Sequence, residues 1–246
     1  MLSKGRAGPS RGGTGMRVNT ARVPPGGPRR CAAPRAPPVG PGRLDRLGTI
    51  VATHLLYLHG FRSSPHSFKA RMLADWLAAH RPEVTWWCPQ LPLSPREAIA
   101  LAEQGTAAWP RDASGRVAVL GSSLGGFYAT VLAERWGCPA VVMNPAVDPA
   151  RDLVGFVGEL EAFHDPSQRF EFRAGYIDEL RAMTPGPVTR PERYYALVAK
   201  GDELLDWREM HARYPGAAGR LLEGSDHGLS DFAQHLPAIL DFLQLN

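Results

Sequence analysis

Short apolar segments alternate with amphipathic segments along most of this chain, and this alternation restricts the fold more than any other feature. Each apolar segment is almost wholly hydrophobic, as in residues 54–59 and 140–143. Strands that are apolar on both faces are typical of a parallel sheet covered by helices on both sides. We therefore expect a mostly parallel sheet of about six strands. The expected strands are residues 54–59, 84–88, 116–120, 140–143, 194–198 and 220–222. The expected helices are residues 64–77, 94–108, 124–136 and 237–243, with one or two more around 150–162 and 175–183. The first of these helices is expected to open at Ser64-Pro65.

The first fifty residues differ from the rest in composition and charge. They contain ten Gly and eight Pro, and ten Lys or Arg against the single acid Asp45, for a net charge of +9. Such a segment buries too little apolar surface to offset the entropy of ordering its backbone. We expect residues 1–50 to be a disordered extension and residues 51–246 to be one folded domain. A chain without residues 1–48 should fold and keep its activity.

Charge and cysteine usage exclude several functional classes. The overall charge of +4 comes from the extension, because the rest of the chain holds 18 bases and 23 acids. A duplex-binding surface on the domain is therefore not expected, although the basic extension leaves open a nonspecific contact with nucleic acid or anionic lipid. There is no apolar run of eighteen residues and no secretory signal, so we expect neither a membrane span nor export. Cys31, Cys88 and Cys138 form no CxxC pair, which fits a reducing, cytoplasmic compartment.

The third expected strand runs into the sequence Gly-Ser-Ser-Leu-Gly at residues 121–125, which opens a helix. This is the G-x-S-x-G pattern in the strand–turn–helix context of a nucleophile elbow. Ser123 would occupy a strained backbone position there, so the residues two before and two after it must lack colliding side chains. A Ser/Gly turn without chemistry is the alternative, and the flanking strand and helix argue against it.

A serine nucleophile needs a histidine base, and the chain has eight histidines. In hydrolases with this elbow the chain order is Ser, acid, His, which leaves His164, His211, His227 and His235. His227 lies in a glycine-flanked loop before the closing helix. We interpret the segments that contain His164 and His211 as helical as well, and His235 leads into the closing helix. We therefore expect His227 to be the base.

The base in turn needs a carboxylate to fix its tautomer. Asp202 comes first after the glycine turn that ends the fifth strand, so we prefer it to Glu203 and to Asp206, the main alternative. Asp226 is adjacent to His227 in sequence and would point away from the imidazole.

An oxyanion hole should complete the site. One donor would be the backbone N–H of Leu124, directly after the nucleophile. The other would be the N–H of Phe61, in the loop after the first strand, where Gly60 permits a close approach. We expect His59 to shape this loop, whereas Arg62 is either a solvated arginine or a contact for a substrate carboxylate.

Several blocks of this sequence resemble the YqiA-like esterases, an α/β-hydrolase family. They are residues 57–65 with Ser67, Lys69 and Ala70, then 121–130, 144–147, 201–206 and 226–228. The resemblance covers about residues 54–243 and implies an α/β-hydrolase fold with a short helical cap. It also implies a serine esterase acting on short acyl esters or acyl-CoA thioesters, with Ser123, Asp202 and His227 as the triad. The basic extension has no counterpart in that pattern, and the variable residues 148–192 would cover the acyl pocket.

These features lead to the expectation of a cytoplasmic serine esterase. It would need no metal or organic cofactor, and its partner would be a small acyl ester rather than a specific nucleic acid or a membrane. Two alternatives stay open. The same triad could hydrolyse an amide or peptide, or the chain could be a non-catalytic binding protein on a hydrolase scaffold.

Overall fold

The computed structural model describes residues 51–110, 117–161 and 169–246, all of which belong to one compact unit. Six strands in these ranges form one sheet in the order β2-β1-β3-β4-β7-β8, and every neighbouring pair is parallel. The predicted parallel sheet is therefore confirmed, whereas the expected extension of residues 1–50 lies outside the described residues. The strands are β1 His54–Leu58, β2 Thr85–Trp87, β3 Val117–Ser122, β4 Ala140–Met143, β7 Tyr194–Ala199 and β8 Ala218–Leu222.

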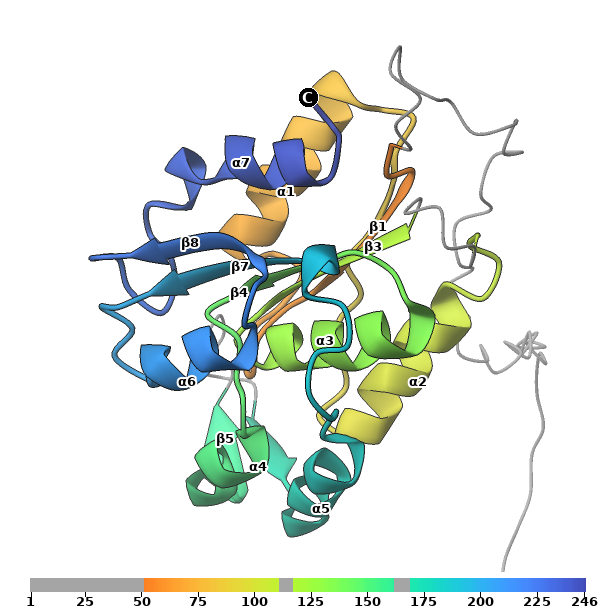
Figure 1. The fold of residues 1–246 in the computed structure, drawn as a ribbon. Coiled ribbons are helices and arrows are strands. Elements are labelled where there is room, and N and C mark those ends of the chain that lie inside the picture. Colours follow the sequence, from red (N-terminus) through yellow and green to blue (C-terminus); the bar gives the residue numbers. More distant parts are fainter. Residues whose placement is uncertain (1–50, 111–116, 162–168) are drawn as a thin grey trace, which may run out of the picture. The chain divides into compact units, whose positions relative to one another are not determined.

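Helices cover both faces of the sheet (Figure 1). Along β1 the side chains alternate, so Leu55 and Tyr57 join one buried cluster and Leu56 and Leu58 join the other. The first cluster also includes side chains of α1 and α7, and the second includes side chains of α2 and α3. Apolar residues on both strand faces are thus buried on both sides, as the sequence pattern predicts. The helices are α1 Phe68–His80, α2 Pro95–Gly105, α3 Leu124–Trp136, α6 Trp207–Arg213 and α7 Leu236–Phe242.

Local hydrogen bonds decide where two of these helices begin. Ser94 caps α2, because its hydroxyl accepts a hydrogen bond from the Glu97 N–H at 3.2 Å. Ser64 does not cap α1. Its hydroxyl accepts from the His66 N–H and its carbonyl from the Ser67 N–H, so a separate turn comes first and α1 begins at Phe68. The expected helix start at Ser64 is therefore wrong.

An insertion between β4 and β7 forms a cap beyond the end of the sheet (Figure 1). The helix expected around 150–162 is wrong, because α4 ends after one turn and an antiparallel hairpin follows. Gly158 opens this hairpin with φ 131°, a conformation that ordinary residues avoid. The helix expected around 175–183 is confirmed as α5. The cap elements are α4 Pro149–Asp152, η1 Val154–Phe156, β5 Gly158–Glu161, β6 Arg169–Phe172 and α5 Ala174–Met183, and η2 Pro191–Arg193 leads into β7.

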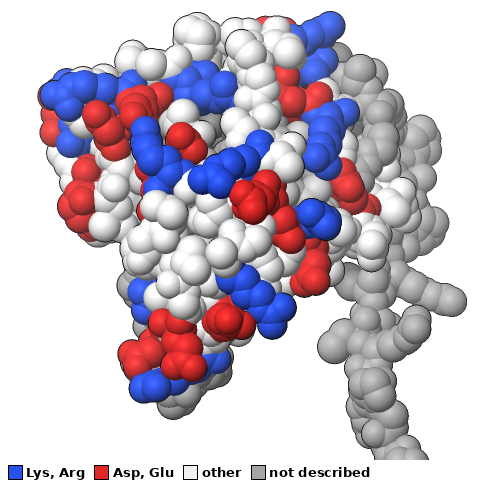
Figure 2. Space-filling view, turned by 90° about the horizontal axis from the view of Figure 1, so that it is seen from below, with Lys and Arg blue, Asp and Glu red and all other residues white. Residues whose placement is uncertain are grey.

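Acidic and basic side chains are intermixed on the face seen in Figure 2, with no large area of one sign. Several charged side chains of the described residues form ion pairs, as when Arg151 contacts both Glu209 and Asp152 within 2.8 Å. None of the helices in the described ranges has the length and apolar character needed to cross a bilayer.

Candidate active site

Ser123 lies in the sharp turn between β3 and α3, with φ 57° and ψ −123°. This strained backbone requires bare glycines around it. A Cβ on Gly121 would lie 2.0 Å from the carbonyl oxygen of Gly125, and a Cβ on Gly125 would lie 1.9 Å from that of Leu58. The two glycines therefore let strand, turn and helix pack at distances that no side chain permits, as the G-x-S-x-G pattern predicts.

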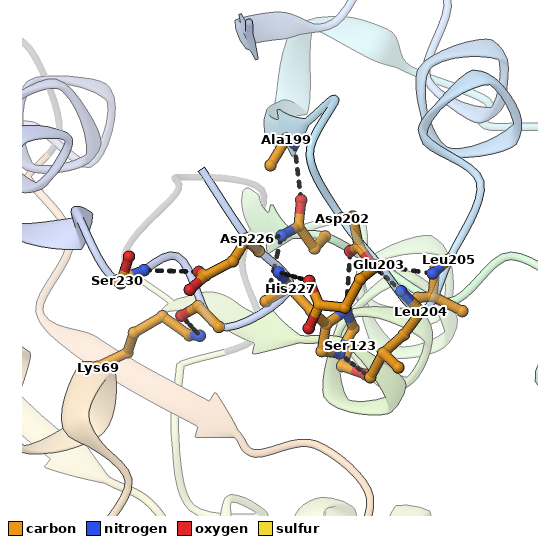
Figure 3. A network of polar contacts seen from close by, with 12 residues as sticks. Lys69, Ser123, Ala199, Asp202, Glu203, Leu204, Leu205, Asp226, His227 and Ser230 are labelled. Atoms are coloured by element: carbon orange, nitrogen blue, oxygen red, sulfur yellow. Dashed lines mark hydrogen bonds and ion pairs between the residues drawn. The ribbon is translucent and has the colours of Figure 1, made fainter. Parts of the chain in front are cut away.

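The loop between β8 and α7 brings His227 to Ser123, although 104 positions separate them in sequence. The Nε2 atom of His227 lies 3.0 Å from Ser123 Oγ, and its Nδ1 atom lies 2.7 Å from Asp202 Oδ2 (Figure 3). Both distances are within hydrogen-bond reach. The structure therefore places the three predicted residues in one continuous hydrogen-bonded chain.

The Asp202 carboxylate is fixed on both of its oxygens. Its side chain is completely buried, and Oδ1 accepts hydrogen bonds from the N–H groups of Leu204 and Leu205, both at 2.8 Å. This leaves Oδ2 directed at His227 (Figure 3). Charged acceptors held by several N–H groups form strong, well-oriented hydrogen bonds.

The other candidate acids have different partners. Asp206 caps α6 by accepting from the Arg208 N–H, and Asp226 accepts from the Ser230 N–H. Glu203 contacts the loop at the backbone, where it accepts from the His227 N–H at 3.0 Å. None of the three is bonded to the imidazole through its carboxylate, and only Asp202 has the position that a triad requires.

The two remaining candidate bases in the described residues, His211 and His235, have other positions and partners. His211 lies on α6, and His235 contacts Asp231 through Nε2 at 3.1 Å. His164 lies outside the described residues. His59 accepts the Leu91 N–H at Nε2, so its Nδ1 carries the proton that bonds the Gly60 carbonyl. The contacts of His59 match the expected structural role.

The predicted oxyanion donors belong to two segments that lie next to the nucleophile. Leu124 is the first residue of α3, and an N–H at that position has no acceptor within its own helix. A Cβ on Gly60 would lie only 3.2 Å from Ser123 Cβ, so the loop that carries Phe61 passes close to the nucleophile. Phe61 and Leu124 also line a common cleft of about 270 Å³.

The cap contacts the loop of Phe61 directly. The Phe61 ring packs edge-on against Phe172 and Phe156, with centroids 5.0 and 5.7 Å apart. The neighbouring Arg62 donates from Nε to the Glu161 carbonyl at 2.6 Å. Part of the Arg62 guanidinium thus ties the loop to the hairpin, and Arg62 also lines the cleft.

Asn144 and Lys69 are two further buried polar residues at this site, and no role was predicted for them from the sequence. Asn144 follows β4 at the carboxyl edge of the sheet and is completely buried. A polar residue directly after an apolar strand was a usable signal. Lys69, on α1, is only 9% exposed, and burial lowers its pKa to about 8 against the opposing effect of Asp226 and Asp202. No sequence pattern marked Lys69 as buried, because a lysine on an amphipathic helix is usually solvated.

In the described residues, no group of three or more His, Cys, Asp or Glu side chains is arranged to hold a metal ion. The groups that the structure places at the elbow are the Ser123 hydroxyl, the His227 imidazole and the Asp202 carboxylate.

The parallel sheet, the strained Ser123 turn and the histidine loop before the last helix define an α/β-hydrolase fold. A family model described as "Uncharacterised protein family (UPF0227)" matches residues 54–244. The chain belongs to this family, the YqiA family, as the resemblance of its motifs predicts.

Solved structures with the same fold are distant in sequence. Alpha/beta hydrolase domain-containing protein 10 from mouse is 14% identical, with a TM-score of 0.56 over 82% of this chain and 92% of that one. Est1E from Butyrivibrio proteoclasticus is also 14% identical, with a TM-score of 0.56 over 79% and 89%. A structure from the study of LipS and LipT, two metagenome-derived lipolytic enzymes, is 17% identical, with a TM-score of 0.54 over 80% and 96%. These likenesses concern the fold.

Proposed function

We propose that this protein is a serine hydrolase that cleaves short-chain acyl esters through an acyl-enzyme. One observation carries the proposal: the hydrogen-bonded chain from Ser123 Oγ through His227 to the buried Asp202 carboxylate. A serine hydroxyl becomes nucleophilic when an adjacent base takes its proton, and a carboxylate stabilises the resulting imidazolium.

In the first half-reaction, Ser123 Oγ attacks the ester carbonyl carbon while its proton passes to His227 Nε2. The N–H groups of Phe61 and Leu124 would stabilise the oxyanion. The tetrahedral intermediate then expels the alcohol, which takes the proton from His227, and Ser123 is left acylated.

In the second half-reaction, water attacks the acyl carbon and gives a proton to His227. Collapse of the second intermediate releases the carboxylic acid and returns the proton to Ser123 Oγ. Protons and bonds therefore balance, and this route uses only groups of the chain and water.

The cleft beside the loop that carries Phe61 agrees with a substrate that has a small, apolar acyl group. Its volume is about 270 Å³, near the lower end for ligand pockets. Leu91, Leu93, Tyr128 and Phe170 contribute to its lining, and Phe170 comes from the cap hairpin. The fold neighbours include proteins named as an esterase and as lipolytic enzymes, which agrees with ester chemistry. The Cys88 thiol forms no disulfide with another described residue, which fits the cytoplasmic location that we also propose.

The test is hydrolysis of p-nitrophenyl esters from acetyl to decanoyl by the full chain, with an acyl-CoA and an anilide as comparison substrates. We expect turnover with an optimum at short acyl chains, and at least a thousandfold loss in Ser123→Ala. Faster cleavage of the anilide would instead favour an amide hydrolase. Absence of turnover by folded wild-type protein on every substrate would favour the binding-protein alternative.

A further inference from the structure

Three consecutive carbonyl groups of the loop that carries His227 accept hydrogen bonds from two buried side chains. Asn144 Nδ2 donates to the carbonyl oxygens of Asp226 at 2.9 Å and His227 at 3.1 Å. Lys69 Nζ donates to the next carbonyl, that of Gly228 (Figure 3). We propose that Asn144 and Lys69 are positioning residues that together hold the imidazole of His227 between Ser123 and Asp202. This inference rests on the proposed hydrolase function, and we call the two side chains the carbonyl cradle.

Asn144 links the two chain segments that carry the acid and the base. Its Oδ1 accepts the N–H of Ala199 at 2.8 Å, and Ala199 is the last residue of β7, three positions before Asp202. One amide group thus binds the strand end that leads to Asp202 and the loop that contains His227. Its orientation follows from its partners, because Nδ2 faces two carbonyl oxygens and Oδ1 faces an N–H.

The backbone of Asn144 also indicates a specific role. Its φ of 40° lies in the left-handed region, where Asn is among the few residues with a side chain that are often found. Such conformations persist when the surroundings over-determine them, and they cluster at functional sites. Here the residue with this backbone conformation is the one whose side chain bonds to the histidine loop.

Lys69 holds the same loop from another element of the fold. It lies on α1, 159 positions before Gly228. A buried ammonium group requires compensating partners, and these are the Gly228 carbonyl and the negative charges of Asp226 and Asp202. Burying the Lys69 ammonium group costs free energy, and this cost agrees with a contact whose role is to fix the position of the loop.

The loop is flanked by glycines, which restrict the backbone less than other residues do. Gly224 and Gly228 flank it, and a Cβ on Gly224 would meet no atom within 4 Å. The His227 N–H is tied to Glu203, so the cradle adds constraints on the carbonyl side of the same peptide units. A displacement of about 1 Å at a catalytic group can reduce a rate about 100-fold, which gives such constraints a function.

Asn144→Asp tests the cradle with almost no change of shape. Aspartate tolerates the same backbone conformation and can still accept the Ala199 N–H, but it places an oxygen against the carbonyls of Asp226 and His227. We expect kcat on p-nitrophenyl acetate to fall about 100-fold with KM within about twofold. Asn246→Asp makes the same chemical change at an exposed position and should leave both constants unchanged.

Lys69→Met removes the other arm of the cradle and keeps an unbranched side chain only one atom shorter. We expect kcat to fall at least about tenfold, again with little change in KM. The matched control is Lys200→Met, since Lys200 pairs with the exposed Glu223 and does not contact the loop carbonyls. Lys69→Arg retains a charged donor and should recover part of the lost kcat.

A spectroscopic readout separates the cradle from the proposed function. The proton shared by His227 Nδ1 and Asp202 should give a downfield NMR resonance, identified by its absence in His227→Ala. We expect this resonance to be lost or shifted in Asn144→Asp and Lys69→Met, while the controls retain it. If wild type hydrolyses no ester, the proposed function fails and this resonance still tests the cradle.

The inference is overturned if both variants keep wild-type kcat and an unchanged resonance. It is also overturned if kcat falls only in proportion to the unfolded fraction measured by circular dichroism. Should Asn144→Asp fail to fold, Lys69→Met and its rescue by Lys69→Arg decide the question.

Discussion

A methyl group added at Gly125 would test the steric reasoning behind the nucleophile turn. The Cβ of Gly125→Ala would lie 1.9 Å from the carbonyl oxygen of Leu58 and 2.7 Å from that of His59. Ordinary contact begins near 3.4 Å, so the two segments must separate by about 1.5 Å. The obstacle is the backbone of β1 inside the sheet, which cannot rotate away as a side chain could.

The cost follows from this displacement. Overpacking typically destabilises by 1–3 kcal/mol, and a backbone collision belongs at the upper end, about 3 kcal/mol. For a domain of this size each kcal/mol lowers Tm by roughly 2–4 °C, so we expect a decrease of about 6–12 °C. Ser123 would move with the start of α3, and ester hydrolysis by the folded protein should fall about 100-fold.

Thermal unfolding by circular dichroism and initial rates well below Tm measure the two effects. Gly155→Ala is the matched control, because a Cβ at Gly155 meets no atom within 4 Å. If Gly125→Ala matches this control in both Tm and rate, the claim that close packing requires glycine at the elbow is refuted.

Three further changes address the acid, the buried lysine and the cleft. Asp202→Asn keeps the shape of the acid but removes its charge, so kcat should fall about 10⁴-fold with little change in KM. A loss of kcat below tenfold would indicate that another residue is the acid. Because burial lowers the pKa of Lys69 to about 8, the unfolded chain binds more protons above that pH, and the free energy of unfolding should rise by about 1.5 kcal/mol between pH 8 and 9.5. Urea titrations should show this rise weakened in Lys69→Met, and an identical rise would contradict the assignment. Phe170→Ala enlarges the cleft and should shift the preferred p-nitrophenyl ester toward longer acyl chains, whereas an unchanged optimum would place the acyl group elsewhere.

The sheet could be predicted from the sequence because its strands are short, apolar and clearly bounded. The predicted limits of β4 and α3 coincide with those observed. At α3 the reason is local, since Ser123 sets the start of the helix and Gly137, with φ 68°, ends it in the left-handed conformation. The candidate triad could be predicted as well. Ser123 and Asp202 come shortly after predicted strands, and His227 lies in a glycine-flanked loop.

Within the cap, the helix α5 could be predicted, but the hairpin could not, because its structure depends on contacts between segments. Residues 158–161 read Gly-Glu-Leu-Glu, and Glu and Leu favour helices in isolation. Pairing with β6, as between Leu160 and Phe170, makes this segment a strand instead. The role of Lys69 could not be predicted from the sequence for the same reason, because its partner Gly228 is distant in sequence.

The central claim is that Ser123 is a nucleophile activated by His227. The most direct test is labelling of the full chain with a fluorophosphonate, followed by peptide mass spectrometry. The account predicts one adduct per chain at Ser123, its absence in Ser123→Ala, and a strongly reduced labelling rate in His227→Ala. Folded wild-type protein that remains unlabelled, or that is labelled at a different residue, would contradict it.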